Sequence, residues 1–199
     1  MQKEIYDYEG NFVEGLARVG KDDKFGFIDK MNNVVVPLQY EDVWNFSEGL
    51  AAVQKDGKRG FVNKMGEEVI PCQYGYTYNF VNGLAKVMHE NRKWGYVDKT
   101  GTEVVPCQYD DCSYQYNQGY ILVGNNGMYG FYGWKFDKEE PYIGQIMDCK
   151  IKGGEELLDY MEKSELDNDG FKEELNNLRL SKTYATQLIN SKKEQNQER

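Results

Sequence analysis

The sequence contains a single histidine, only four prolines and no long hydrophobic run. One histidine cannot form the paired-histidine motifs of common metalloenzymes. No apolar segment approaches the about 20 residues that a transmembrane helix needs. Basic residues are outnumbered, because 24 lysines and arginines stand against 33 aspartates and glutamates, which gives a net charge of −9. Since nucleic acids are bound through a basic face, neither a nucleic-acid partner nor a membrane is expected.

The first twelve residues, MQKEIYDYEGNF, lack the apolar stretch of a secretory signal peptide. We therefore expect a cytoplasmic protein, in which cysteines stay reduced rather than forming disulfides. The cysteines expected as free thiols are Cys72, Cys107, Cys112 and Cys149.

One block of sequence recurs along the chain. It reads FVEGLARV at 12–19, FSEGLAAV at 46–53, FVNGLAKV at 80–87 and, less closely, YNQGYILV at 116–123. The copies start at residues 12, 46, 80 and 116, so they are 34, 34 and 36 residues apart. A fixed period of this length is the sequence pattern of a repeat architecture.

Further blocks follow in the same order within each copy. A glycine with a large residue before it comes first, as Phe25-Gly26, Arg59-Gly60, Trp94-Gly95 and Tyr129-Gly130. Three copies then continue as VVVPLQY at 34–40, VIPCQY at 69–74 and VVPCQY at 104–109. Tyr6 precedes Phe12 by the same six residues as Tyr40 precedes Phe46, so residues 1–11 read as the end of a partial repeat.

Within each copy the pattern predicts β-strands. Asp56-Gly57 and Asn126-Gly127 suit the positive φ angles of a tight hairpin turn. A third strand is expected to end at its proline, which cannot donate to a ladder and marks the end or edge of a sheet. The glycine before Phe61 is expected to let a neighbouring ring lie on the backbone. Each copy is then a three-stranded meander, too small to be stable unless copies stack.

The recurring blocks resemble those of the bacterial WG-repeat family, named for its Trp-Gly pair, over roughly residues 6–132. Only Trp94-Gly95 keeps the literal pair, while the other copies keep the glycine alone. The resemblance implies a β-rich repeat array that serves as an interaction module, and it implies no reaction. We expect a mainly β fold of stacked meanders, forming a solenoid or superhelical array, followed by a C-terminal α-helical segment.

Three regions are expected along the chain. Residues 1–136 form the repeat array, with repeats starting near residues 12, 46, 80 and 116, and the fourth copy lacks a proline strand. Residues 137–152 form a connector. Residues 153–199 are acidic with apolar residues at helical spacing, which predicts an amphipathic tail that either caps the array or binds a partner.

No catalytic residue, cofactor or metal site is predicted. Cys72 and Cys107 occupy equivalent positions, and Leu38 stands there in the first copy, which indicates an apolar packing position rather than a ligand. Cys107 and Cys112 have no histidine near them in the sequence, and His89 lies in a lengthened turn without a counterpart in other copies. The common nucleophile, phosphate-binding and dinucleotide motifs are absent.

The candidate binding residues lie where the repeats differ, in the segments 41–45, 75–79 and 110–115. These segments combine rings with carboxylates and are expected to form a stripe along one side of the array. Tyrosine and tryptophan there suit protein contacts or sugar stacking, or they fill gaps between repeats. The predicted partner-binding residues are Trp44, Tyr76, Tyr78, Tyr114, Glu41, Asp42, Asp110 and Asp111.

The sequence favours a non-catalytic, intracellular protein–protein interaction module, such as an inhibitor, an immunity protein or an adaptor. Its acidic charge would steer it towards a basic protein partner. The alternative is a repeat protein that binds carbohydrate or cell wall through the aromatic stripe. An enzyme with a carboxylate pair in a groove is the third and least supported hypothesis.

Overall fold

The structure is a computed structural model that describes residues 5–113, 120–135 and 142–152. The chain divides into two compact units, Met1–Gln115 and Tyr116–Arg199. The described residues form β-strands and contain no helix. None of them therefore supplies a helix long and apolar enough to cross a membrane. The predicted helical tail, residues 153–199, lies outside the described residues.

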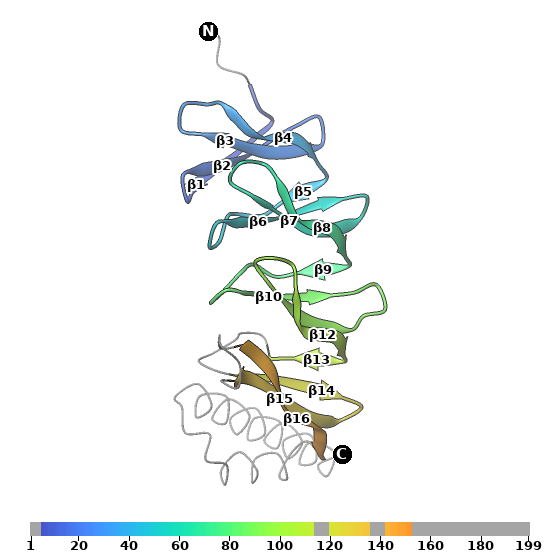
Figure 1. Ribbon diagram of the computed structural model, residues 1–199. Coiled ribbons are helices and arrows are strands. Elements are labelled where there is room, and N and C mark those ends of the chain that lie inside the picture. The colour runs from blue at the N-terminus through green and yellow to red at the C-terminus, as the bar shows by residue number, and fades with distance from the viewer. Residues whose placement is uncertain (1–4, 114–119, 136–141, 153–199) are drawn as a thin grey trace, which may run out of the picture. The chain divides into compact units, whose positions relative to one another are not determined.

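The first unit consists of antiparallel sheets that follow one another along the chain (Figure 1). The first sheet contains β1 (Tyr8–Val13), β2 (Leu16–Lys21), β3 (Lys24–Asp29) and β4 (Val34–Tyr40). The second contains β5 (Asp42–Val43), β6 (Leu50–Lys55), β7 (Lys58–Asn63) and β8 (Glu68–Tyr74). The third contains β9 (Tyr76–Thr77), β10 (Leu84–Met88), β11 (Trp94–Asp98) and β12 (Glu103–Tyr109), and the short β13 (Asp111–Cys112) follows.

Each sheet has four strands rather than the three that the sequence predicts. The additional strand in the second and third sheets is only two residues long and begins after a single residue, Glu41 or Gly75. In β5, Val43 pairs with Val53 of β6. So short a strand has no hydrophobic alternation of its own, which is why the sequence pattern does not reveal it.

The predicted hairpin turns are confirmed. Asp56 and Gly57 have φ angles of 51° and 72°, and Asn126 and Gly127 have φ angles of 52° and 74°. Positive φ at both central residues is the geometry of a type I′ turn, whose twist matches that of the flanking strands.

The sequence predicts that the third strand of each copy ends at its proline. The strand instead continues beyond the proline to the tyrosine. In β8, Pro71 lies within a bulge, since Phe61 of β7 pairs with Ile70 and Arg59 pairs with Tyr74. An advance of two residues along β7 is thus matched by an advance of four along β8. The bulge accommodates a residue that cannot donate a ladder hydrogen bond, and β8 is an edge strand, as expected for proline.

In the first three copies the shared glycine faces this bulge, and the atoms closest to the position of its Cβ belong to the bulged strand rather than to the aromatic ring that the sequence predicts. A Cβ atom on Gly60 would lie 2.4 Å from the carbonyl oxygen of Ile70 and 2.6 Å from the carbonyl carbon of Pro71. Gly26 and Gly95 meet the corresponding backbone of β4 and β12 at similar distances. The close approach of two backbones therefore requires glycine here.

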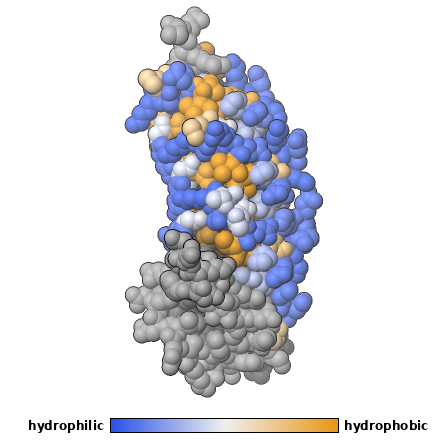
Figure 2. All heavy atoms as spheres, in the orientation of Figure 1, coloured by the Kyte–Doolittle hydropathy of each residue, from blue (hydrophilic) through white to orange (hydrophobic). Residues whose placement is uncertain are grey.

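Two hydrophobic cores lie between neighbouring sheets. Phe27 of the first sheet contacts Phe46 of the second at a ring-centroid distance of 4.8 Å. Phe61 of the second contacts Phe80 of the third, again at 4.8 Å and nearly the same angle. Figure 2 shows hydrophobic residues at successive levels of this unit, with hydrophilic residues between them. Each sheet therefore depends on its neighbour for burial.

The described part of the second unit contains β14 (Tyr120–Asn125), β15 (Met128–Lys135) and β16 (Tyr142–Lys152), which pair in antiparallel order. The residues that the sequence indicated as a connector thus include a strand. In β16, Met147 pairs with Phe131 and Ile151 pairs with Tyr129, so an advance of two residues along β15 is again matched by an advance of four along β16. The fourth copy therefore has its bulged outer strand, reached through a longer connection and formed without a proline.

Candidate partner-binding surface

Three of the predicted rings come together between the second and third sheets. Trp44 follows β5, Tyr76 lies in β9, and Tyr78 follows β9. The rings of Tyr76 and Tyr78 are 5.2 Å apart, and Trp94 of β11 lies 6.1 Å from Tyr76 and 5.9 Å from Tyr78. Backbone hydrogen bonds from Trp44 to Ala52 and from Tyr78 to Lys86 hold these segments on their sheets.

Arg59 of β7, which the sequence analysis did not select, lies between two of these rings. Its guanidinium carbon is 4.3 Å from the ring centroid of Trp44 and 4.1 Å from that of Tyr76. Such stacking on ring faces is favourable for a guanidinium. We call Trp44, Arg59, Tyr76, Tyr78 and Trp94 the Arg59 surface. Arg59 occupies the position before the shared glycine, where the third copy has Trp94, and this exchange is the sequence signal for it.

Two other cations that lie over aromatic rings, Lys86 over Trp94 and Arg18 over Tyr8, are bound within the protein. Lys86, with only 7% of its side chain exposed, lies 4.6 Å from the ring centroid of Trp94. Its ammonium group donates to Asp111 Oδ1 at 3.1 Å and to the carbonyl of Cys112 at 2.6 Å. In the first sheet, Arg18 donates to the carbonyl of Val43 at 3.1 Å and to the hydroxyl of Tyr8 at 2.9 Å.

The predicted carboxylates serve turns and ion pairs. Glu41 accepts the backbone N–H of Gly57 at 3.0 Å, and this hydrogen bond lowers the pKa of Glu41. Asp42 Oδ1 accepts the backbone N–H of Val43, and Asp110 pairs with Lys93 at 2.6 Å. These groups, together with Asp111, therefore have partners inside the chain. Tyr114 lies outside the described residues.

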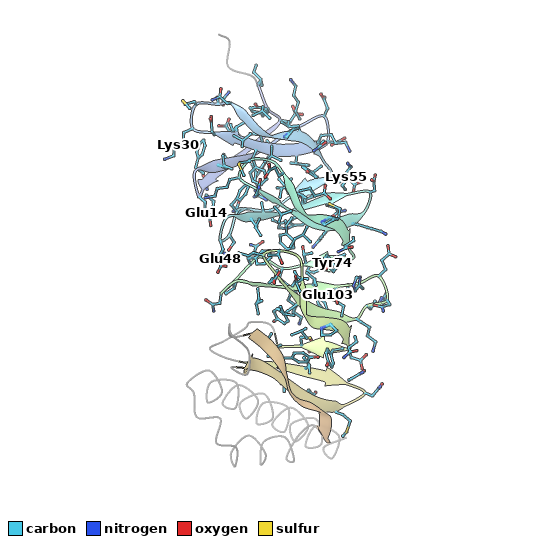
Figure 3. The ribbon with its side chains drawn as sticks, in the orientation of Figure 1. Glu14, Lys30, Glu48, Lys55, Tyr74 and Glu103 are labelled. Carbon is cyan, nitrogen blue, oxygen red and sulfur yellow. The ribbon has the colours of Figure 1, made fainter. Side chains whose placement is uncertain are left out.

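Two glutamates fix the register between successive sheets. Glu48 accepts the backbone N–H of Gly83 at 2.9 Å and pairs with Lys99 at 3.1 Å. Glu14 makes the same contacts one repeat earlier, with Gly49 and Lys64. Figure 3 shows both glutamates at the same edge of consecutive sheets. Burial alone would raise the pKa of Glu48, but the donors of Gly83 and Lys99 lower it below its ordinary value. These contacts hold the rings of adjacent sheets in a fixed relation.

The thiols are partly buried under the bulges. Burial, with the nearby Glu68 carboxylate, raises the pKa of Cys72 to about 11. Burial and Glu103 raise the pKa of Cys107 as well. One ligand atom of Cys107, one of Glu103 and one of His89 lie within 4.8 Å of one another. No histidine is near Cys107 in the sequence, and the pairing of β10, β11 and β12 brings His89 there from 18 residues away along the chain (107 − 89).

A family model described as the WG containing repeat matches residues 5–25, 25–58, 60–92 and 94–129. A solved structure described as KlHsv2 with loop 6CD replaced by a Gly-Ser linker is 10% identical, and the match covers 72% of this chain and 70% of that chain. Its TM-score is 0.27, and so weak a likeness supports no conclusion. A search of curated proteins finds no match. The four family matches together span residues 5–129, and the chain belongs to the WG-repeat family.

Proposed function

We propose that this chain is a non-catalytic protein-binding module that acts inside the cell, and that the Arg59 surface is its docking site. The membership of a repeat family supports a binding role. In this proposal the sheets act together as a solenoid array that holds the rings of neighbouring repeats side by side. Tryptophan, tyrosine and arginine are the residues that most often dominate the energy of protein interfaces.

The observation that carries the proposal is the set of contacts that the Arg59 side chain makes. Within the part of the chain that the structure describes, this side chain contacts two rings and has no hydrogen bond or ion pair. A guanidinium has five N–H donors in a rigid fork that fits a carboxylate. Because the rings already fix its orientation, a partner carboxylate would bind it at little cost in side-chain entropy.

The same arrangement favours a protein over a carbohydrate as the partner. Sugar rings stack on free aromatic faces, and Arg59 covers one face of Trp44 and one of Tyr76. The net charge of −9 would steer association towards a basic protein. The partner that fits both features is a basic protein that presents one carboxylate to Arg59, as expected for an inhibitor, immunity protein or adaptor.

The proposal is tested by capturing proteins from a bacterial lysate on the immobilised wild-type chain and two variants. Arg59→Ala removes the anchor, and Lys58→Ala removes the same charge from the neighbouring residue, whose ion pair with Glu90 is exposed. We expect a protein that is retained by wild type and Lys58→Ala and lost from Arg59→Ala. With that partner purified, Arg59→Ala should raise Kd about 30-fold, the loss typical of an interface hot spot.

A parallel glycan array distinguishes the alternative. Glycan binding that disappears in Arg59→Ala, without any protein partner, would establish the carbohydrate function instead. If no protein and no glycan depends on Arg59, the Arg59 surface is not the binding site.

A further inference from the structure

The third sheet brings together three side chains that can bind metal and that the proposed function does not use. His89 Nε2 lies 2.9 Å from Glu103 Oε1, and the ligand atoms of His89, Glu103 and Cys107 all lie within 4.8 Å of one another. We propose that these three residues bind one divalent transition-metal ion of the zinc class, with a coordination position left open to water or to a fourth ligand.

Different contacts orient the side chains of Glu103 and His89. Glu103 begins β12, and its Oε2 accepts the backbone N–H of Cys107 in the bulge at 3.1 Å, which orients Oε1 towards His89. His89 directly follows β10, and the ring of Tyr74 lies 5.1 Å from the imidazole ring. Tyr74 and Glu103, both labelled in Figure 3, come from neighbouring sheets. Two of the three side chains are thus already oriented.

The donor set selects the metal. An imidazole nitrogen, a thiolate sulfur and a carboxylate oxygen are the ligands of zinc, whereas magnesium and calcium prefer oxygen alone. In a tetrahedral zinc site, neighbouring ligand atoms lie about 3.3 to 3.8 Å apart. The 2.9 Å between His89 Nε2 and Glu103 Oε1 and the limit of 4.8 Å on the three ligand atoms lie on either side of this range. Three protein ligands with one open position is the arrangement that zinc adopts outside purely structural sites.

The second sheet holds the same arrangement without the histidine. Glu68 Oε1 accepts the backbone N–H of Cys72 at 3.0 Å, as Glu103 does for Cys107. The thiol of Cys72 lies 3.8 Å from the carbonyl of Val53, and that of Cys107 lies 3.9 Å from the carbonyl of Val87. Lys55 stands where the third copy has His89. A lysine leaves two ligands instead of three, so the second sheet is a matched control.

Because cysteine binds a metal as the thiolate, Cys107 must release its proton when the ion binds.

The experiment is a titration of the reduced full-length protein with Co²⁺, whose bond to a thiolate gives a charge-transfer band in the near ultraviolet. We expect one equivalent to bind and Zn²⁺ to displace it. Cys107→Ser should abolish the band, Cys72→Ser should keep it, and His89→Lys should weaken Co²⁺ binding at least tenfold. Lys55→His should add a second equivalent, and far-ultraviolet circular dichroism checks that each variant is folded.

Three results would overturn the inference: a wild-type protein that shows no thiolate band, a folded Cys107→Ser protein that keeps it, or a Lys55→His protein that still binds a single equivalent. Because none of these variants alters the Arg59 surface, loss of the metal site and loss of partner binding are measured separately.

Discussion

Gly60 shows how much of this fold depends on one missing side chain. The carbonyl oxygen of Ile70 and the carbonyl carbon of Pro71 occupy the space that a Cβ would need, and both belong to the backbone. Neither atom can move without opening the bulge that lets Pro71 lie in an edge strand. The strict recurrence of glycine beside a variable partner follows from this contact.

We predict that Gly60→Ala lowers the free energy of unfolding by about 2 to 4 kcal/mol, since the new methyl group must displace backbone. Urea denaturation measures the change. Gly75→Ala is the matched control, because the atom nearest to its new Cβ, apart from the adjacent residues, would be 3.6 Å away. We expect its free energy of unfolding to change by less than about 0.5 kcal/mol. Equal losses of stability in the two variants would show that the bulge can shift to accommodate the methyl group of Gly60→Ala.

The Arg59 surface marks the limit of sequence reasoning at this scale. The rings of Trp44, Tyr76 and Tyr78 were predicted because they lie where the repeats differ. Arg59 was missed because it lies within the recurring motif, at the position where the third copy has Trp94. An arginine there looks like a degenerate form of the tryptophan. That it lies between two rings depends on the spacing of adjacent sheets, which a single sequence does not contain.

Among the structural elements, the glutamate contacts between sheets set a pH dependence. The pKa of Glu48 is lowered from 4.5, so its contribution to stability is present above that value and is lost as the pH falls through the lowered pKa. We predict that Glu48→Gln costs about 1 kcal/mol at pH 7 and less at about pH 3, measured by urea unfolding at both values.

Glu90→Gln is the comparison for this prediction. Glu90 and Lys58 form an ion pair whose side chains are 68% and 45% exposed, so solvent screens it and its loss should change stability little at either pH. A Glu48→Gln protein with the same stability loss at both pH values would contradict the role of the Glu48 charge.

The elements themselves could be predicted only where the chain carries local signals. Asp56-Gly57 identified a hairpin because the φ angles of that turn restrict which residues can form it. β16 was missed because it has no proline and follows an unusually long connection. β5 was missed because two residues cannot show a period. The extension of β8 beyond Pro71 was missed because the bulge that accommodates proline depends on how β8 pairs with β7, which a single sequence does not show.

At the scale of the whole first unit, the shared cores predict cooperative unfolding. Phe61 and Phe80 bury each other across two sheets, so one sheet cannot unfold without exposing the other. Proteins that retain only Trp44 or only Trp94 as a fluorophore report on the second and third sheets separately. We expect their urea midpoints to coincide.

Phe80→Leu should shift both midpoints together, with a loss of about 1 to 2 kcal/mol, because it weakens a core that both sheets share. Two separated transitions, or a shift confined to the Trp94 reporter, would show that the sheets unfold independently.

The single residue between the last strand of one sheet and the first of the next has an evolutionary consequence. Between β4 and β5 only Glu41 is available, and between β8 and β9 only Gly75. A hairpin turn can lengthen without moving its strands, as the third copy has done around His89. An insertion between two sheets would instead reverse which side chains of the following strand face the core. Natural variation in length among such chains should therefore accumulate at the turns. Whole copies should be gained or lost more readily than a single residue between two sheets.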